Sequence, residues 1–152
     1  MKARIVIGAL TLSASALVGI AVHEGYRGEA YIPVKGDVPT IGFGTTDGVK
    51  PGDTIEPVQA LVRKLADVQR FEGALKQCVR VPLHQHEYDA FLSLAFNIGP
   101  GAFCGSTLVR RLNAGDYAGA CAEILRWDRF RGEPLRGLTL RRQAENRQCL
   151  GQ

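Results

Sequence analysis

The sequence predicts an α+β protein that is mostly helical, with a small β-hairpin near the N-terminus and several helices after it. Residues 29–46 are rich in Gly, Pro and β-branched side chains, a composition typical of short strands and turns. Residues 56–150 instead carry apolar side chains at steps of three and four, which is typical of helices. At 152 residues and 45% hydrophobic, the chain is long enough to bury the core of one domain.

The expected elements follow in order along the chain. We expect a hairpin or meander in residues 29–46, with a turn at 34–37, and further turns at 47–48 and 51–52. The apolar stripe of the first long helix consists of Val58, Leu61, Val62, Leu65, Val68 and Phe71. The helices are expected at about 56–77, from Pro82 to Gly99, from Ser106 to 113, at 117–127 and at 138–150, with a loop at 126–137.

The N-terminus has an export pattern. Lys2 and Arg4 precede an uncharged run, residues 5–22, made of nine Ile, Leu or Val and nine Gly, Ala, Ser or Thr. A cleaved signal peptide, a permanent membrane helix and a weak anchor that can leave the bilayer are three interpretations of this run. The many small residues suit the weak anchor, and a buried N-terminal helix is the alternative for a soluble protein.

Charge and cysteines narrow the class further. With 19 basic and 15 acidic side chains, the net charge of +4 favours an anionic partner such as nucleic acid, a lipid surface or an acidic glycan. The absence of a basic run or a repeat argues against a basic-tailed nucleic-acid binder and a solenoid. The four cysteines form no CxxC pair, which argues against a zinc site; they are Cys78, Cys104, Cys121 and Cys149. They indicate either two disulfides or four buried thiols. Because the N-terminus indicates export, disulfides are favoured.

Carboxylates are the best candidates for chemistry. The sequence holds three histidines and no GxSxG motif, which argues against a nucleophilic triad, and the glycines 42 and 44 indicate a tight turn rather than a phosphate loop. Glu24 ends the apolar run, Asp37 lies in the predicted hairpin turn, and Thr40 follows three residues later. An acid at a helix end facing a carboxylate and a hydroxyl suits glycoside hydrolysis, although an ordinary exposed Glu is the alternative for Glu24.

Four separated blocks, in order, resemble the phage-type lysozymes of glycoside hydrolase family 24. They are His23–Tyr31 with Pro39–Thr46, Asp89–Gly99, Ser106–Tyr117, and Trp127 with Gly137–Glu145. The resemblance covers residues 23–150 and implies a lysozyme-like fold, with a small N-terminal β-hairpin lobe, a helical C-terminal lobe and the cleft between them. It implies an endolysin that cuts the β-1,4 bond between N-acetylmuramic acid and N-acetylglucosamine in peptidoglycan, without a cofactor or metal.

The resemblance also assigns residues to roles. Glu24 is implied as the general acid and Thr40 as a third catalytic residue. The family's usual Asp or Cys falls here on Pro33, which cannot serve, so Asp37 takes the second carboxylate role, with Glu29 or no acid as alternatives. If Asp37 and Thr40 place a water on the opposite sugar face, the reaction inverts the anomeric centre.

Other residues have open assignments. Asn97 is expected to bind sugar or to cap its helix. Arg141 or Arg142 pairs with Glu24 or with wall carboxylates, or lies on a solvated helix face. Because Cys104 and Cys121 bracket a short helix pair, we expect one disulfide there, and a second between Cys78 and Cys149.

Exported members of the family carry a signal-anchor-release segment, and the resemblance implies one at residues 1–22, before a catalytic domain at 23–152. We expect an inactive protein tethered to the inner membrane, which membrane depolarisation releases into the periplasm as a monomer. No cysteine lies in the anchor, so a thiol-exchange switch has no basis. The expected partners are peptidoglycan strands and the membrane, not nucleic acid. A lytic transglycosylase and a non-enzymatic, membrane-anchored glycan-binding lysis protein are the rival functions.

Overall fold

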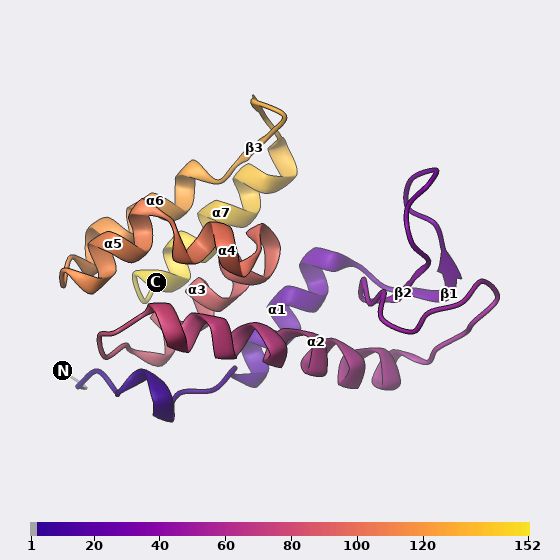
Figure 1. The fold of residues 1–152 in the computed structure, drawn as a ribbon, viewed down its shortest axis with the longest axis horizontal. Helices are drawn as coiled ribbons and strands as arrows, with labels where there is room; N and C mark the ends of the chain where they lie inside the picture. The colour runs from indigo at the N-terminus through magenta and orange to yellow at the C-terminus, as the bar shows by residue number, and fades with distance from the viewer. Residues whose placement is uncertain (1–2) are drawn as a thin grey trace. The chain divides into compact units, whose positions relative to one another are not determined.

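The computed structural model describes residues 3–152, and it confirms a mostly helical α+β fold (Figure 1). The chain forms two compact units, which are described separately below. Unit 1 comprises Met1–Ala16 and Phe71–Gln152, and unit 2 comprises Leu17–Arg70. The division falls inside two helices, α1 and α2.

The elements agree closely with the predicted order. They are η1 (Ile7–Ala9), α1 (Ala14–Glu24), β1 (Arg27–Tyr31), β2 (Thr40–Gly42), α2 (Pro57–Cys78), α3 (Gln85–Ile98), α4 (Pro100–Cys104), α5 (Thr107–Asn113), α6 (Tyr117–Glu123), η2 (Ile124–Arg126), β3 (Arg129–Phe130), β4 (Glu133–Pro134) and α7 (Arg136–Cys149). The expected loop at 126–137 contains the short antiparallel pair β3–β4.

In unit 2, β1 and β2 form the predicted antiparallel hairpin, with Tyr31 opposite Thr40 and an irregular register between the two ends. The connection between the strands projects as a loop (Figure 1). A small core lies beneath, and it consists of Ile41, Val49, Ile55 and Ala60, with Ala30 and Phe43 packed against it. Tyr26 closes one side of this core, because its hydroxyl donates a hydrogen bond of 2.7 Å to the Ile55 carbonyl.

The tight turn predicted at the paired glycines is present directly after β2. Ile41 and Thr45 exchange two backbone hydrogen bonds, of 2.9 and 3.0 Å, across this turn. Gly42 has a φ of 63° and Gly44 a φ of 84°, values that L side chains rarely adopt. A Cβ at Gly42 would also lie 2.8 Å from the Cβ of Ala60, so glycine is required for α2 to pack against the turn.

The buried face of α2 differs from the predicted stripe. Val58 and Val62 are 75% and 63% exposed, so the predicted stripe is wrong at these two positions. The buried side chains are instead Ala60, Lys64, Val68, Glu72 and Leu75. They repeat at steps of four and then three, as one face of a helix requires. Two of the five are charged, which is unusual for a buried face.

In unit 1, the central element is α3, in which nine consecutive residues from Glu87 to Ala95 are buried. Helix α7 packs against α3. At their junction, Glu145 accepts a hydrogen bond of 2.6 Å from the Ser93 hydroxyl and pairs with Arg141 and Arg142 at 3.1 and 2.9 Å. Both arginines are buried, so a solvated helix face is wrong for them, and burial lowers the pKa of Arg142.

The start of the described chain is tied to unit 1. Ile5 and Leu83 exchange two backbone hydrogen bonds of 2.8 Å. Arg4 donates to the buried Glu87 carboxylate at 2.8 Å and lies 3.5 Å from the centroid of the Tyr117 ring. The hydrogen bond to Glu87 raises the pKa of Arg4, although desolvation opposes the rise.

Two further carboxylates bind the same N-terminal segment. Asp89, 3% exposed, accepts hydrogen bonds from the backbone N–H and the hydroxyl of Ser13, at 3.1 and 2.6 Å. Glu72 accepts from the backbone N–H of Leu12 at 2.8 Å and from the Tyr88 hydroxyl at 3.0 Å. Burial, followed by the charge of Glu72, raises the pKa of Tyr88, which stays protonated.

The uncharged run at 5–22 is not one continuous helix here. It forms η1, an extended stretch and most of α1, and Leu10, Ala16, Ile20 and Ala21 in it are buried. Among residues 3–152, no helix has both the length and the apolar character needed to span a bilayer. Lys2, one of the two charges before the run, lies outside the described residues.

The four cysteines form two disulfides, as predicted, but the predicted pairing is wrong. The bonds join Cys78 to Cys104 and Cys121 to Cys149. Helices α5 and α6 do pack together, as the prediction assumed, but Cys104 precedes them in α4, where its sulfur lies 3.7 Å from the Ala74 carbonyl of α2. Cys121 in α6 instead meets the end of α7, which packs against α6.

Both disulfides should stabilise the protein to a similar degree, because they join residues that are 26 and 28 positions apart. Replacing Cys121 and Cys149 together with Ala should lower the free energy of unfolding by about 2–4 kcal/mol. The pair Cys78 and Cys104 should cost about the same. Urea unfolding of the full chain measures both losses, and a loss well below 1 kcal/mol for either pair would contradict the expectation.

Candidate active site

Glu24 is the last residue of α1, and its side chain is exposed. The helix ends here because Gly25 has a φ of 72°, outside the helical region. The N–H of Gly25 still donates to the Ala21 carbonyl at 3.0 Å, which fixes the last turn. The carboxylate therefore stands on a well-defined helix end, just before the hairpin begins.

The Glu24 carboxylate lies over the glycine turn that follows β2. Its Oε2 atom is 3.3 Å from the point where a Cβ of Gly44 would stand, and the Cβ of Glu24 is 4.0 Å from that point. Lys64 of α2 approaches the same point, with its Nζ atom at 3.7 Å. The missing side chain at Gly44 thus leaves room for both a carboxylate and an ammonium group.

The turn itself is held by a hydrogen bond to α2. Thr45, 3% exposed, donates from its hydroxyl to Asp67 at 2.5 Å. Asp67 also pairs with Arg70, which reaches Asp47 at 3.2 Å. These two carboxylates, Asp67 first, raise the pKa of Arg70. The hydrogen bond between Thr45 and Asp67 therefore fixes the position of the neighbouring Gly44 next to Glu24.

Thr40 and Asp37 lie in the hairpin of the same unit. Thr40 is the first residue of β2 and is 6% exposed, and its hydroxyl donates to the Val38 carbonyl at 3.2 Å. Asp37 lies in the exposed loop, where its carboxylate accepts from the Val38 N–H at 2.8 Å and its own N–H donates to Val34 at 2.9 Å. The two candidate residues are thus connected through Val38.

The alternative second carboxylate, Glu29, lies in β1, where its residue forms a bridge to Thr54. Pro33, at the family's usual acid position, lies in the exposed loop after β1. This loop runs from residue 32 to 39 and holds one acid, Asp37. The choice between Asp37 and Glu29 stays a prediction.

Asn97 lies in unit 1, in the last turn of α3, and its side chain is exposed. It does not cap the helix, because Gly99 is the C-cap residue, with a φ of 90° and its N–H bonded to the Ala95 carbonyl. The capping alternative for Asn97 is therefore wrong. Its role in sugar binding stays a prediction.

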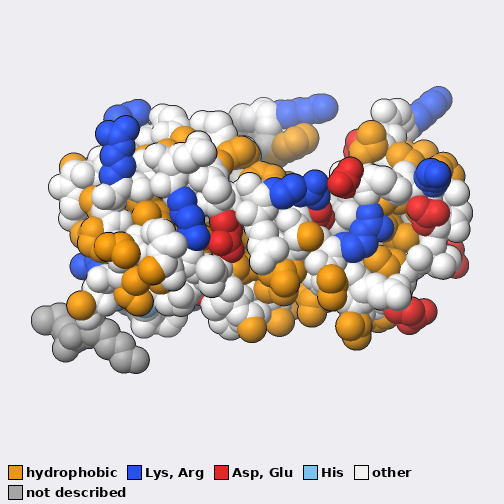
Figure 2. Space-filling model, turned by 60° about the horizontal axis from the view of Figure 1, so that its bottom comes forward, with side chains coloured by type: hydrophobic (Ala, Val, Ile, Leu, Met, Phe, Trp, Pro, Cys, Tyr) orange, Lys and Arg blue, Asp and Glu red, His pale blue; other side chains and the backbone are white. Residues whose placement is uncertain are grey.

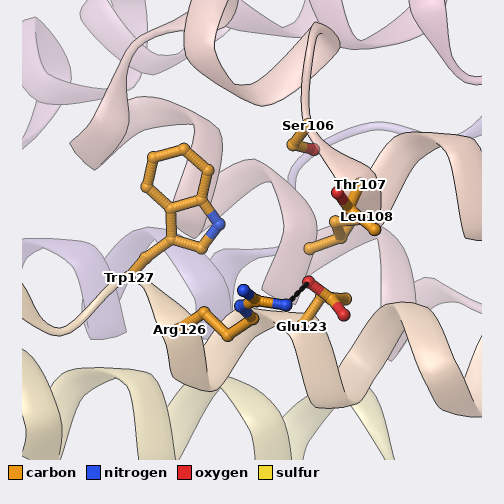
Figure 3. A pocket seen from close by; sticks show the side chains of 6 residues that line it. All are labelled: Ser106, Thr107, Leu108, Glu123, Arg126 and Trp127. Carbon is orange, nitrogen blue, oxygen red and sulfur yellow. Dashed lines mark ion pairs between the residues drawn. The ribbon is translucent and has the colours of Figure 1, made fainter.

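Unit 1 also contains a hollow of about 240 Å³. It is lined by Ser106, Thr107, Leu108, Glu123, Arg126 and Trp127. In Figure 3 the indole of Trp127 faces the start of α5 across the hollow, and Arg126 pairs with Glu123 at 3.5 Å on the floor. Hydroxyl, guanidinium and carboxylate groups beside one indole suit a polar ligand with an apolar face.

Basic and acidic side chains are interspersed over the face shown in Figure 2. Among residues 3–152, no group of three or more His, Cys, Asp or Glu side chains is arranged to hold a metal ion.

Comparison with known proteins identifies the family of this chain. The family described as Phage lysozyme matches residues 21–145. The endolysin of Acyrthosiphon pisum secondary endosymbiont phage 1 is 41% identical over 88% of this chain and 94% of its own. The SAR-endolysin of Pseudomonas phage phiKMV is 38% identical over 90% and 87%. The muramidase domain of SpmX from Asticaccaulis excentricus superimposes with a TM-score of 0.86, at 29% identity, over 93% of this chain and 98% of that one.

Fold and similarity together define a glycoside hydrolase of the lysozyme type. The chain belongs to the phage lysozyme family. The resemblance found in the sequence is thereby confirmed, and so is the prediction of an endolysin with muramidase activity.

The sequence interpretation missed two neighbours of Glu24. Lys64 was not among the candidate residues, and Gly44 was interpreted only as part of a turn. A signal for Lys64 was present, because it lies four residues from both Ala60 and Val68, on the same helix face. No sequence pattern indicated that this face meets the end of α1.

Proposed function

We propose that this endolysin cleaves the β-1,4 bond between N-acetylmuramic acid and N-acetylglucosamine with Glu24 as its general acid. The observation that carries the proposal is the Glu24 carboxylate, exposed at the end of α1 and placed over the Gly44 turn. In this role Glu24 donates a proton to the leaving glycosidic oxygen as the sugar becomes cationic.

Thr40 and Asp37 then position and activate the water molecule that attacks the anomeric carbon. The Thr40 hydroxyl already donates to Val38, so its oxygen is available to accept a hydrogen bond from a water molecule. Asp37, tied to the same residue, supplies the carboxylate that removes the proton from that water. Attack from the face opposite to the leaving group inverts the anomeric centre.

The first test is the Glu24→Gln variant in the full chain. Residues 3–22 are retained because Leu10, Ile20 and Ala21 are buried in the fold. Loss of a general acid should reduce turbidity clearing of chloroform-treated Gram-negative cells by about 10²–10⁴-fold. The exposed Glu56→Gln, in the same unit, is the matched control. Clearing by Glu24→Gln at the rate of the control would refute the assignment.

The second test concerns Asp37. Asp37→Asn should reduce kcat by about 10²-fold or more, whereas Glu29→Gln should keep most of the activity. NMR of the first-formed product should show the α anomer, and a β product would reject inversion. Reducing ends in the product identify a hydrolase, whereas 1,6-anhydro ends would identify the rival lytic transglycosylase.

We also propose that residues 1–22 first tether the protein to the inner membrane, facing the periplasm, and are then released. The uncharged run and the name of the phiKMV relative, a SAR-endolysin, support this step. Within unit 1, residues 4–13 form hydrogen bonds to Glu72, Glu87 and Asp89. In the proposed step these carboxylates bind the segment after it has left the bilayer. The released protein then acts on peptidoglycan as a monomer, without a nucleic-acid partner.

Gly8 and Gly19 allow a clean test of this step, because a Cβ at either position meets no atom within 4 Å in the folded protein. Replacing both with Leu makes membrane insertion more favourable, so release on depolarisation and cell lysis should slow. Gly73→Leu, equally open but outside the run, is the matched control. Membrane fractionation before and after depolarisation measures release. Unchanged release of the double variant would count against the anchor.

A further inference from the structure

Lys64, on α2, is a charged residue at a buried position. Its side chain is 1% exposed, between Ala60 and Val68 on the buried face of α2. Burying an ammonium group costs free energy unless negative charge or hydrogen-bond acceptors offset the loss of water. An apolar side chain would fill this helix position without that cost. A role for the positive charge of Lys64 would explain why the position holds lysine.

A negatively charged group lies near Lys64 at the Gly44 turn. The Nζ atom of Lys64 and the Oε2 atom of Glu24 both lie within 4 Å of the one point where a Gly44 side chain would stand. Asp67, one helical turn from Lys64, is already bound by Thr45 and Arg70. The Gly44 turn thus brings the ammonium group of Lys64 and the carboxylate of Glu24, two groups of opposite charge, close to one point of unit 2.

We infer that Lys64 is a positioning residue for the general acid, and that its buried ammonium group holds the Glu24 carboxylate over the Gly44 turn. The inference rests on the proposed role of Glu24. Attraction to a fixed positive charge narrows the range of orientations that a carboxylate at a helix end adopts. Proton donation depends steeply on this placement, because an error of about 1 Å costs roughly 10²-fold in rate.

The activity test is Lys64→Met in the full chain, which keeps the length of the side chain and removes its charge. On soluble glycan-strand oligomers, kcat should fall by about tenfold or more, while KM changes by less than about twofold, because Lys64 does not bind the sugar. Arg63→Met, the neighbouring charge on α2, is the matched control, since its guanidinium donates to the Asp47 carbonyl instead. A folded Lys64→Met protein that keeps the kcat of the control overturns the inference.

A second measurement covers the case in which Lys64→Met fails to fold. The ¹⁵Nζ resonance of Lys64, assigned in the wild type through side-chain correlations, should shift when Glu24 is replaced by Gln and should stay in place with Glu56→Gln. An unmoved Lys64 resonance in Glu24→Gln overturns the inference without any assay of activity. Failure of the proposed function looks different, because Glu24→Gln itself would then retain activity.

Discussion

Three buried carboxylates bind the N-terminal segment from residue 4 to residue 13. Glu72, Glu87 and Asp89 lie on α2 and α3, and each accepts hydrogen bonds from residues 4–13. A carboxylate withdrawn from water is tolerated only when such partners are present. Helix α1 begins at the next residue, Ala14.

The site depends on the lack of a side chain at Gly44. Gly44 has no side chain, and its φ of 84° would strain any other residue. A methyl group there would lie 3.3 Å from Oε2 of Glu24, so the Glu24 carboxylate would have to shift by a few tenths of an ångström, whereas Lys64 at 3.7 Å would be in ordinary contact. Thr45 and Asp67 keep the turn in place from the other side. In this small unit, the Gly44 turn between Glu24 and Lys64 is therefore held by the hydrogen bond of Thr45 to Asp67 as well as by the packing of a short hydrophobic core.

The sequence predicted most elements because their signals are local. The first long helix was expected at about 56–77 and spans Pro57–Cys78, and the hairpin and its glycine turn were also expected. Its buried face was partly misjudged, because Val58 and Val62 are exposed while Lys64 is buried. A single helix does not reveal which side it presents to its neighbours. The disulfide pairing failed for the same reason, since it depends on which helices pack together.

Both disulfides lie between residues 78 and 149, entirely inside unit 1, and neither involves the first 22 residues. Oxidation of the cysteines and docking of residues 3–13 are therefore chemically independent events. In the proposed pathway, the translocated part of the chain can complete its covalent maturation while the N-terminal run is still in the bilayer. On this proposal the protein held at the membrane is already oxidised, and the exit of one segment from the bilayer, rather than the formation of a covalent bond, sets the onset of lysis.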